Sequence, residues 1–365
     1  MDAKFFSPKP IGLSGFSLSW ILTAGLILMS ISLDLLSDRS LGVVPSLTSP
    51  LCLAALITAV LGSCAVPWLR TLKTGQFIRE DGPQAHFKKA GTPTMGGIFF
   101  VPVAIGLTLL LVGPTSKVFA VCALTLAYAG IGWLDDWQVL CRKSNKGISP
   151  RFKLALQIGF AALFCLWTLA TQPENITHVA LPFGITLPLG LLFWPLAGFT
   201  LVAESNATNL TDGLDGLMAG TGAIALLGLA ALIAPTHPDL MVFCAALSGS
   251  CLGFLVHNHN PAKVFMGDTG TLALGGALAA VGILSGHLFG LLILSLIFLA
   301  ETVSVIIQVS YYKSTKGPDG IGKRFFRMAP LHHHFELSGW SEIHVVGTFY
   351  AIGALLALLA LSYLG

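Results

Sequence analysis

Long apolar runs separated by short polar segments make up most of the chain. The runs are continuous rather than alternating, and most reach the roughly 20 residues that a helix needs to cross the hydrocarbon core of a bilayer. Because no water satisfies the backbone at that depth, such runs predict helices and not the alternating strands of a barrel. Eleven runs qualify, at residues 16–36, 47–69, 98–112, 118–134, 154–171, 185–203, 217–234, 240–256, 272–284, 288–309 and 345–364.

The composition excludes a water-soluble protein. Apolar residues make up 54% of the 365 residues and charged residues 10%, with a mean hydropathy of +0.81, whereas soluble domains carry about 25% charge. The seven cysteines are scattered without the C-x-x-C spacing of a metal site, so we expect them to pack as small apolar residues. We therefore predict one all-α polytopic membrane domain with no separately folding soluble module.

Basic residues predict the orientation of this domain, because cytoplasmic loops collect Lys and Arg. Of the 20 basic residues, 18 fall in the N-terminal segment and in segments 70–97, 135–153, 204–216, 257–270 and 311–344, and only Arg39 and Lys117 fall opposite. This distribution requires a chain break near Gly286 and places the C-terminus outside. Six carboxylates are expected on the same inner side: Asp135, Asp136, Glu204, Asp212, Asp215 and Asp268.

Asp135 and Asp136 end the fourth apolar run. Adjacent carboxylates repel each other unless a cation or a proton relieves them, and Mg²⁺ is commonly bound through one or two carboxylates together with substrate phosphates. The alternative is a solvated helix end balanced by Arg142 and Lys143.

Residues 206–216 space polar groups every three positions directly after an apolar run. A three-residue step drifts around a helix, so these groups cannot share one face. Gly213 and Gly216 are expected to break the helix and to let backbone amides approach a ligand. Such polar density at a membrane edge suggests a wet cavity, and a capped polar loop is the alternative.

Two further segments carry polar side chains on the inner side. Residues 258–270 combine Asn258, Lys263, Phe265 and Asp268 at a helix entrance, where a simple N-cap is the alternative. Residues 328–336 contain three consecutive histidines, which cannot all face one metal from a regular helix. Imidazoles that bind phosphate oxygens are the better interpretation.

Residues 88–97 add two lysines and a glycine-rich turn ahead of the third run. Lys88 and Lys89 fit an anionic ligand, and the positive-inside bias is the alternative explanation.

Taken together, segments 91–97, 135–136, 209–216, 265–268 and 329–336 resemble the bacterial phospho-N-acetylmuramoyl-pentapeptide transferases, a branch of the polyprenyl-phosphate sugar-1-phosphate transferase superfamily. The aspartate motifs are shared across the superfamily, while the triple histidine is more specific to this branch. The resemblance begins near Gly75 and continues to the C-terminus.

The resemblance implies an enzyme of the bacterial inner membrane with a cytoplasmic active site. It would transfer phospho-MurNAc-pentapeptide from its UDP carrier to undecaprenyl phosphate with Mg²⁺, release UMP, and form the first lipid intermediate of peptidoglycan. The implied catalytic residues are Asp135, Asp136 and Asp268, with Asp268 as the metal ligand. The implied nucleotide and phospho-sugar residues are Lys89, Thr94, Asn209, Asp212, Gly213, Leu214, Asp215, Asn258, Phe265, His332, His333 and His334.

The sequence departs from the family pattern in three places. Val139 stands where the family has a lysine, and Arg142 or Lys143 is the expected replacement. The loop 313–324 is longer than usual. The first helix is an addition to the family's usual ten, which divides the chain into an N-terminal extension, 1–46, and a transferase membrane domain, 47–365.

Two other functions remain open at this stage. A secondary transporter would explain the intramembrane acids Glu301 and Asp34, although matching inverted repeats are not visible. A sibling transferase with another UDP-sugar is the nearer alternative. The expected partners are the UDP donor, the lipid phosphate and the bilayer, with no nucleic acid. The sequence leaves open a homodimer, a covalent intermediate and the third residue of the pentapeptide.

Overall fold

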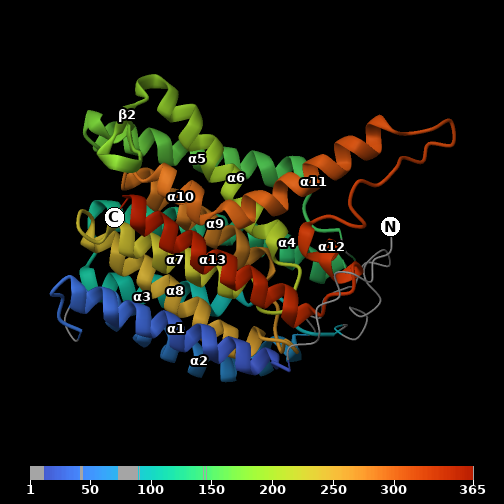
Figure 1. The fold of residues 1–365 in the computed structure, drawn as a ribbon, viewed down its shortest axis with the longest axis horizontal. Helices are drawn as coiled ribbons and strands as arrows, with labels where there is room; N and C mark the ends of the chain where they lie inside the picture. Colours follow the sequence, from blue (N-terminus) through green and yellow to red (C-terminus); the bar gives the residue numbers. More distant parts are fainter. Residues whose placement is uncertain are drawn as a thin grey trace.

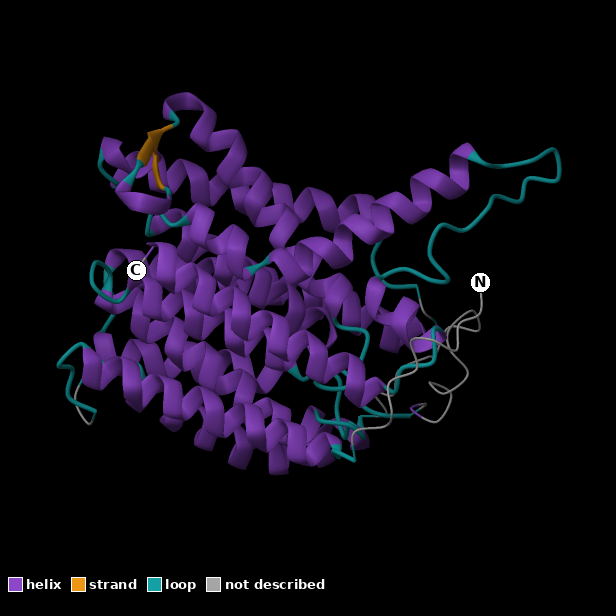
Figure 2. Ribbon diagram, viewed as in Figure 1, coloured by secondary structure: helices purple, strands orange, loops and turns teal. Residues whose placement is uncertain are grey.

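The computed structural model describes residues 12–41, 44–72, 89, 91–142, 144 and 146–364. Within these residues the chain forms a bundle of helices with one small β-hairpin (Figures 1 and 2). The helices are α1 Gly15–Leu36, α2 Thr48–Thr71, α3 Gly97–Val112, α4 Ser116–Arg142, α5 Pro150–Thr171, α6 Phe193–Thr211, α7 Leu217–Ile233, α8 Pro238–Asn258, α9 Gly267–Leu284, α10 Leu288–Leu294, α11 Leu296–Ser314, α12 Leu331–Leu337 and α13 Glu342–Leu364. The strands are β1 His178–Ala180 and β2 Thr186–Pro188.

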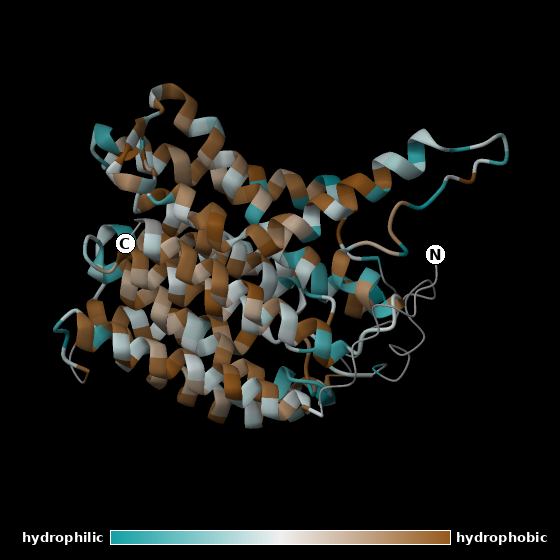
Figure 3. Cartoon of the chain, in the orientation of Figure 1, coloured by the Kyte–Doolittle hydropathy of each residue, from teal (hydrophilic) through white to brown (hydrophobic). Residues whose placement is uncertain are grey.

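The helices confirm the all-α, multi-pass membrane fold. Among the described residues, eight helices are long and apolar enough to cross a bilayer, and α3 and α7 are shorter apolar helices. Helices α8 and α9 are almost entirely buried, whereas α1, α5 and α11 expose many apolar side chains. Apolar exposure on the outer helices fits contact with lipid tails. Hydrophilic residues gather around α12, at one end of the bundle (Figure 3).

The run 185–203 is shorter as a helix than the hydropathy indicates. Helix α6 begins only at Phe193, and the preceding residues form β2, which pairs antiparallel with β1. Gly184 and Gly190 adopt positive φ angles of 71° and 54°. These left-handed positions, together with Pro188, interrupt the helix although the side chains around them are apolar.

The run 288–309 is two helices rather than one. The break between α10 and α11 falls at Ser295, whose Oγ donates a 2.6 Å hydrogen bond to Glu204 Oε1. Glu204 was predicted among the inner-face carboxylates, but it is buried within α6 and its partner is this helix break. The predicted break near Gly286 is confirmed, since α9 ends at Leu284 and Gly286 has a φ of 73°.

The segments with predicted chemistry meet at one end of the bundle. Figure 1 shows α12 and the loop after α11 at the end where α13 begins, whereas α13 terminates at the opposite end, beside the β-hairpin. The loops after α6, α8 and α11 lie together at this end, since Gly216 N donates to Asn258 Oδ1 and Gly213 lies against His332. We call this end, which the sequence predicts to face the cytoplasm, the inner end, and the end with the β-hairpin the outer end.

Candidate active site

The buried carboxylate of Asp136 fixes the start of α9. Asp136, near the end of α4, accepts hydrogen bonds from the backbone N–H of Asp268 at 3.2 Å and of Thr269 at 3.0 Å, and from Thr269 Oγ1 at 2.6 Å. Gly132 permits this approach, because a Cβ there would lie 2.1 Å from the Asp268 carbonyl oxygen. Gly267, with a φ of 71°, turns the chain into α9. Asp136 therefore caps the helix that carries Asp268.

Asp268 is surrounded by polar side chains from three other helices. Its Oδ2 accepts a hydrogen bond from Lys153 Nζ on α5, and its Oδ1 accepts a 2.7 Å bond from Asn209 Nδ2 on α6. Asn209 Nδ2 also donates to Thr271 Oγ1 at 2.9 Å, which fixes the amide in this orientation. Asp135 lies close enough for its carboxyl group to interact directly with that of Asp268. Segments far apart in the chain thus converge on one carboxylate.

Asp135 is held by the loop that follows α4. The backbone N–H of Ile148 donates a 2.7 Å hydrogen bond to Asp135 Oδ1, and a Cβ at Gly147 would lie 2.1 Å from the same oxygen. Lys153 Nζ lies 3.7 Å from the other oxygen, Oδ2. One ammonium group therefore faces both Asp135 and Asp268.

The donor set at this point suits a divalent cation. Carboxylate and amide oxygens are the ligands that Mg²⁺ prefers, and two carboxyl groups in contact need a positive charge near them. Here the ammonium of Lys153 supplies that charge. No cluster of three or more His, Cys, Asp or Glu side chains forms a complete metal site among the described residues. Mg²⁺ sites in proteins commonly use only one or two carboxylates, with substrate phosphates and water as the remaining ligands.

A second cluster joins Lys89 to two carboxylates. Lys89 Nζ lies 2.7 Å from Asp215 Oδ1 and 2.5 Å from Glu342 Oε1. Asn260 Nδ2 donates to both acids, at 3.1 Å to Asp215 and 2.9 Å to Glu342, and the backbone N–H of Ala262 adds a 3.0 Å bond to Asp215. Burial alone would lower the pKa of Lys89, but Glu342 and Asp215 outweigh it and raise the pKa. Lys89 is therefore a fixed cation.

Asp212 connects the two clusters electrostatically. It follows the last residue of α6, and its neighbouring charges include Asp268, Asp215 and Lys89. Burial, aided by Asp268 and Asp215, raises the pKa of Asp212 from 3.8 to about 7. The inner end of the bundle thus holds more negative charge than its lysines neutralise.

The loop after α6 also contacts the histidine segment. A Cβ at Gly213 would lie 2.1 Å from His332 Nε2, so only glycine fits against this ring. His332 is 1% exposed, its Nδ1 lies 3.2 Å from Glu301 Oε2, and its backbone N–H donates to Glu301 Oε1. The geometry of the side-chain contact is not that of a hydrogen bond, so both ring nitrogens lack a hydrogen-bonding partner among the described residues. A buried ring nitrogen therefore faces the Asp212–Leu214 loop.

The other two histidines of the triplet face different neighbours. His333 Nδ1 lies 2.9 Å from Glu336 Oε2, and His334 Nδ1 accepts a 3.2 Å hydrogen bond from the backbone N–H of Arg327. Partial burial and the charge of Arg327 lower the pKa of His334. The three rings do not converge on one point, as expected for consecutive residues of one helix.

The remaining predicted residues hold the loops together. The backbone of segment 93–97 pairs with that of Phe265, through Phe265 N to Pro93 O at 2.8 Å and Gly96 N to Phe265 O at 2.9 Å. Thr94, on the same segment, is buried with its Oγ1 next to Gly267. Asn258 Nδ2 donates to the carbonyl of residue 264 and its Oδ1 accepts from the N–H of residue 216. Leu214 is buried beside them.

Sequence reasoning missed Lys153 and Glu342. Arg142 was expected to replace the missing family lysine, but its guanidinium donates to the carbonyl of Gly147 and is exposed, and Lys143 lies outside the described residues. Lys153 lies one turn into α5, which starts with Ser149 as its N-cap. A basic residue in the first turn of a helix that enters from the inner side is the signal that could have identified it.

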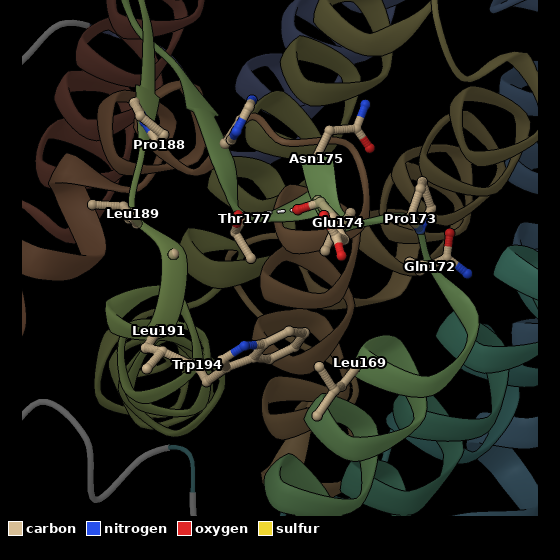
Figure 4. A pocket seen from close by; sticks show the side chains of 13 residues that line it. Leu169, Gln172, Pro173, Glu174, Asn175, Thr177, Pro188, Leu189, Leu191 and Trp194 are labelled. Carbon is tan, nitrogen blue, oxygen red and sulfur yellow. Dashed lines mark hydrogen bonds between the residues drawn. The ribbon is translucent and has the colours of Figure 1, made fainter.

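A cavity at the opposite end of the bundle does not share this chemistry. It has a volume of about 790 Å³ and lies between the ends of α5 and α6 and the β-hairpin (Figure 4). Leu169, Leu191 and Trp194 point into it, and Thr177 Oγ1 donates to the Glu174 carbonyl at its rim. Its described lining includes no Lys or Arg, so it is poorly suited to a diphosphate.

The acids that favoured a transporter have local partners. Asp34, 0% exposed, accepts hydrogen bonds from the backbone N–H groups of Leu47 and Thr48 and from Thr48 Oγ1, and it pairs with Arg39 at 2.9 Å. Glu301 contacts the histidine segment. The burial of Asp34 therefore needs no transported ion, and Glu301 is held through its Oε1 against the backbone of His332.

Known proteins resemble the chain over nearly its whole length. A family model described as glycosyl transferase family 4 matches residues 118–286, and a phospho-N-acetylmuramoyl-pentapeptide-transferase signature matches residues 89–101. The curated phospho-N-acetylmuramoyl-pentapeptide-transferase of Nostoc punctiforme is 64% identical over 363 residues, 99% of this chain and 100% of the relative. The one of Gloeothece citriformis is 61% identical over 98% of this chain and 99% of the relative. With such identity across the full chain, and with the signature beginning at the lysine that pairs with Asp215, the chain belongs to the phospho-N-acetylmuramoyl-pentapeptide-transferase family.

Proposed function

We propose that this chain transfers phospho-MurNAc-pentapeptide from UDP-MurNAc-pentapeptide to undecaprenyl phosphate, which yields lipid I and UMP. The observation that carries the proposal is the meeting of Asp135, Asp268 and Lys153 at one end of a membrane bundle. A water-soluble nucleotide and a membrane lipid can both reach such a place. Burying charged side chains at a membrane edge costs free energy, and such residues usually belong to functional sites.

The active site is proposed to face the cytoplasm from the inner membrane, with the C-terminus outside. The location of 18 of 20 basic residues in the N-terminal segment and the site-side loops supports this orientation. A cytoplasmic site would also meet the UDP donor where nucleotides are made.

Mg²⁺ is proposed to bind at Asp268, with Asp135 beside it, and would offset the charge of the donor diphosphate. Lys153 would then pair with a phosphate oxygen instead of standing alone between the two carboxylates. Asp136 would keep Asp268 in place through its bonds to the start of α9. Asn209, which already donates to Asp268 Oδ1, would orient that carboxylate.

The donor is proposed to lie along the second cluster and the loop after α6. Lys89 would attract the diphosphate, and Asp212, Gly213, Leu214, Asp215 and Asn258 would form or support the nucleotide pocket. Phe265 would stack on uracil. His332, whose ring nitrogen faces Gly213, would reach the phospho-sugar side together with His333 and His334.

The acceptor needs positioning more than deprotonation. A phosphate monoester has a second pKa of about 6, so the lipid phosphate is largely ionised at neutral pH. In a direct reaction, an acceptor oxygen would form a bond to the sugar-bound phosphorus as the bond to UMP breaks, in line. Asp135 would orient the acceptor phosphate for this attack.

A donor comparison in detergent tests the proposal. We expect the purified chain to release UMP from UDP-MurNAc-pentapeptide only when Mg²⁺ and undecaprenyl phosphate are both present. UDP-N-acetylglucosamine serves as the matched donor, because a sibling transferase of the superfamily would use it. Release from UDP-N-acetylglucosamine and not from the muramoyl donor would overturn the proposal in favour of that sibling activity.

A further inference from the structure

We propose that the N-terminal membrane helix α1 is a positioning element of the active site, acting through Asn260 on the donor-binding cluster. This inference rests on the proposed function, because the cluster of Lys89, Asp215 and Glu342 is where the donor is proposed to bind. Sequence reasoning treated α1 as an extension outside the transferase domain. Its contacts place its first residues against the active-site loops instead.

The first turn of α1 lies directly on the loop between α8 and α9. A Cβ at Gly15 would lie 2.3 Å from the Asn260 carbonyl oxygen and 2.9 Å from both the Cβ and the N of Asn260. The ring of Phe16 packs edge-on against His259, with centroids 5.7 Å apart. The absence of a side chain at Gly15 therefore sets how closely the helix and the loop approach.

Asn260 is the member of that loop that reaches the cluster. Its Nδ2 group donates to Asp215 Oδ2 at 3.1 Å and to Glu342 Oε2 at 2.9 Å, so one amide links the two carboxylates that hold Lys89. The backbone N–H of Asp215 also donates to Glu342 Oε1, at 2.7 Å. A shift of the Asn260 backbone would therefore change the spacing of both carboxylates around the lysine.

Helix α1 is fixed along its axis, so it can hold the loop in place. At its start, the ring of Phe16 lies against His259. At its far end, Asp34 binds the first N–H groups of α2. Between these points Leu22 and Leu26 pack against the core, whereas a Cβ at Gly25 would meet nothing within 4 Å. Contacts at both ends and along one face therefore determine the position of α1.

The chain supplies its own matched control for this idea. Gly15→Ala and Gly25→Ala each add one methyl group to the same helix, but only the first meets Asn260. We expect Gly15→Ala to raise the KM for the UDP donor about fivefold, with kcat and the KM for the lipid acceptor within about twofold of wild type. Gly25→Ala should match wild type in all three.

A double-mutant cycle assigns the effect to Asn260. Asn260→Ala alone should raise the donor KM by a similar factor. Adding Gly15→Ala to Asn260→Ala should change the donor KM little further, because Gly15→Ala acts by displacing the Asn260 amide, which the first substitution has already removed. Phe16→Leu, which removes the ring contacts with His259 and with Trp20 of the same helix, decides the matter if Gly15→Ala does not yield folded protein. It should also raise the donor KM and leave the acceptor KM unchanged.

The outcomes separate this inference from the proposed function. If wild type does not turn over the muramoyl donor, the proposed function fails. If wild type is active but Gly15→Ala behaves like Gly25→Ala, or lowers kcat with an unchanged donor KM, or is fully additive with Asn260→Ala, then α1 is not a positioning element.

Discussion

The two ends of the bundle use the same device for different purposes. At the outer end, the buried carboxylate of Asp34 caps α2 by accepting from its first N–H groups and from Thr48 Oγ1. At the inner end, the buried carboxylate of Asp136 caps α9 in the same manner, through two N–H groups and Thr269 Oγ1. Both acids sit at helix N-termini, where the helix dipole favours a negative charge.

The difference lies in what the capped helix carries. Asp34 is paired with Arg39, and α2 brings no further carboxylate to that point. Among the described residues no cation forms an ion pair with Asp136, and α9 presents Asp268 toward Asp135 and Lys153. A buried aspartate that caps a helix is therefore structural at one end and is proposed to support chemistry at the other, where the capped helix starts inside a cluster of charges.

The largest effect is expected at Asp268. Asp268→Asn removes the charge on which Lys153 and the proposed metal ion depend while it keeps the size of the side chain, so UMP release should fall about 1,000-fold. Thermal unfolding in detergent should occur a few degrees below the wild-type temperature, because the ion pair with Lys153 is lost and the relief of repulsion with Asp135 offsets only part of that loss. Activity within tenfold of wild type would show that α9 carries no essential acid, and the contrast between the two ends would disappear.

The two caps should separate activity from stability. Asp34→Asn leaves Arg39 unpaired and turns a donor toward the N–H groups of α2, so we expect Tm to drop by about 5 °C with kcat unchanged. Asp136→Asn should lower kcat about 100-fold, because the displaced start of α9 misplaces Asp268. Tm measured by dye-monitored unfolding and kcat from UMP release distinguish the two. Equal losses of kcat in both variants would contradict the comparison.

The sequence predicts this inner end well where polarity and glycine determine the structure. Gly213 and Gly216 were expected to break a helix, and α6 ends at Thr211 while Gly216 has a φ of 80°. The break near Gly286 was likewise expected from the charge distribution and is present. Such features depend on local backbone conformation and on which side of the membrane a loop lies. Both can be predicted from a short segment of the sequence.

Contacts between distant helices cannot be predicted in that way. Glu204 was expected on the inner face but binds Ser295 at a helix break that apolar composition conceals. Lys153, 115 positions before Asp268, becomes its partner only because α4, α5 and α9 pack together. Hydropathy places each helix in the membrane but does not give its neighbours or its rotation, so the lysine between the two acids could not be found from spacing.

The identity of the site lysine can be tested against the predicted substitute. Lys153→Met should lower kcat about 100-fold, since a phosphate oxygen loses its cation. It should also lower the Mg²⁺ concentration for half-maximal activity, because the positive charge that competes for Asp135 and Asp268 is removed. Arg142→Met, at the exposed end of α4, should leave both values near wild type. If Arg142→Met lowered kcat more than Lys153→Met did, the result would instead support the sequence prediction that Arg142 replaces the family lysine.

The smallest effect contrasts Asp212 at the inner end with the exposed Asp38 at the outer end. Burial, with Asp268 and Asp215 nearby, raises the pKa of Asp212 from 3.8 to about 7, so the native protein keeps a proton there that the unfolded chain loses above about pH 4. This group therefore makes the folded state progressively less stable as pH rises from about 4 to 7. In metal-free buffer, Asp212→Asn should show a smaller decrease in Tm between pH 5 and 8 than wild type, by a few degrees at most. Asp38→Asn should follow the wild-type curve, and an Asp212→Asn curve parallel to wild type would place the titrating charge elsewhere in the cluster.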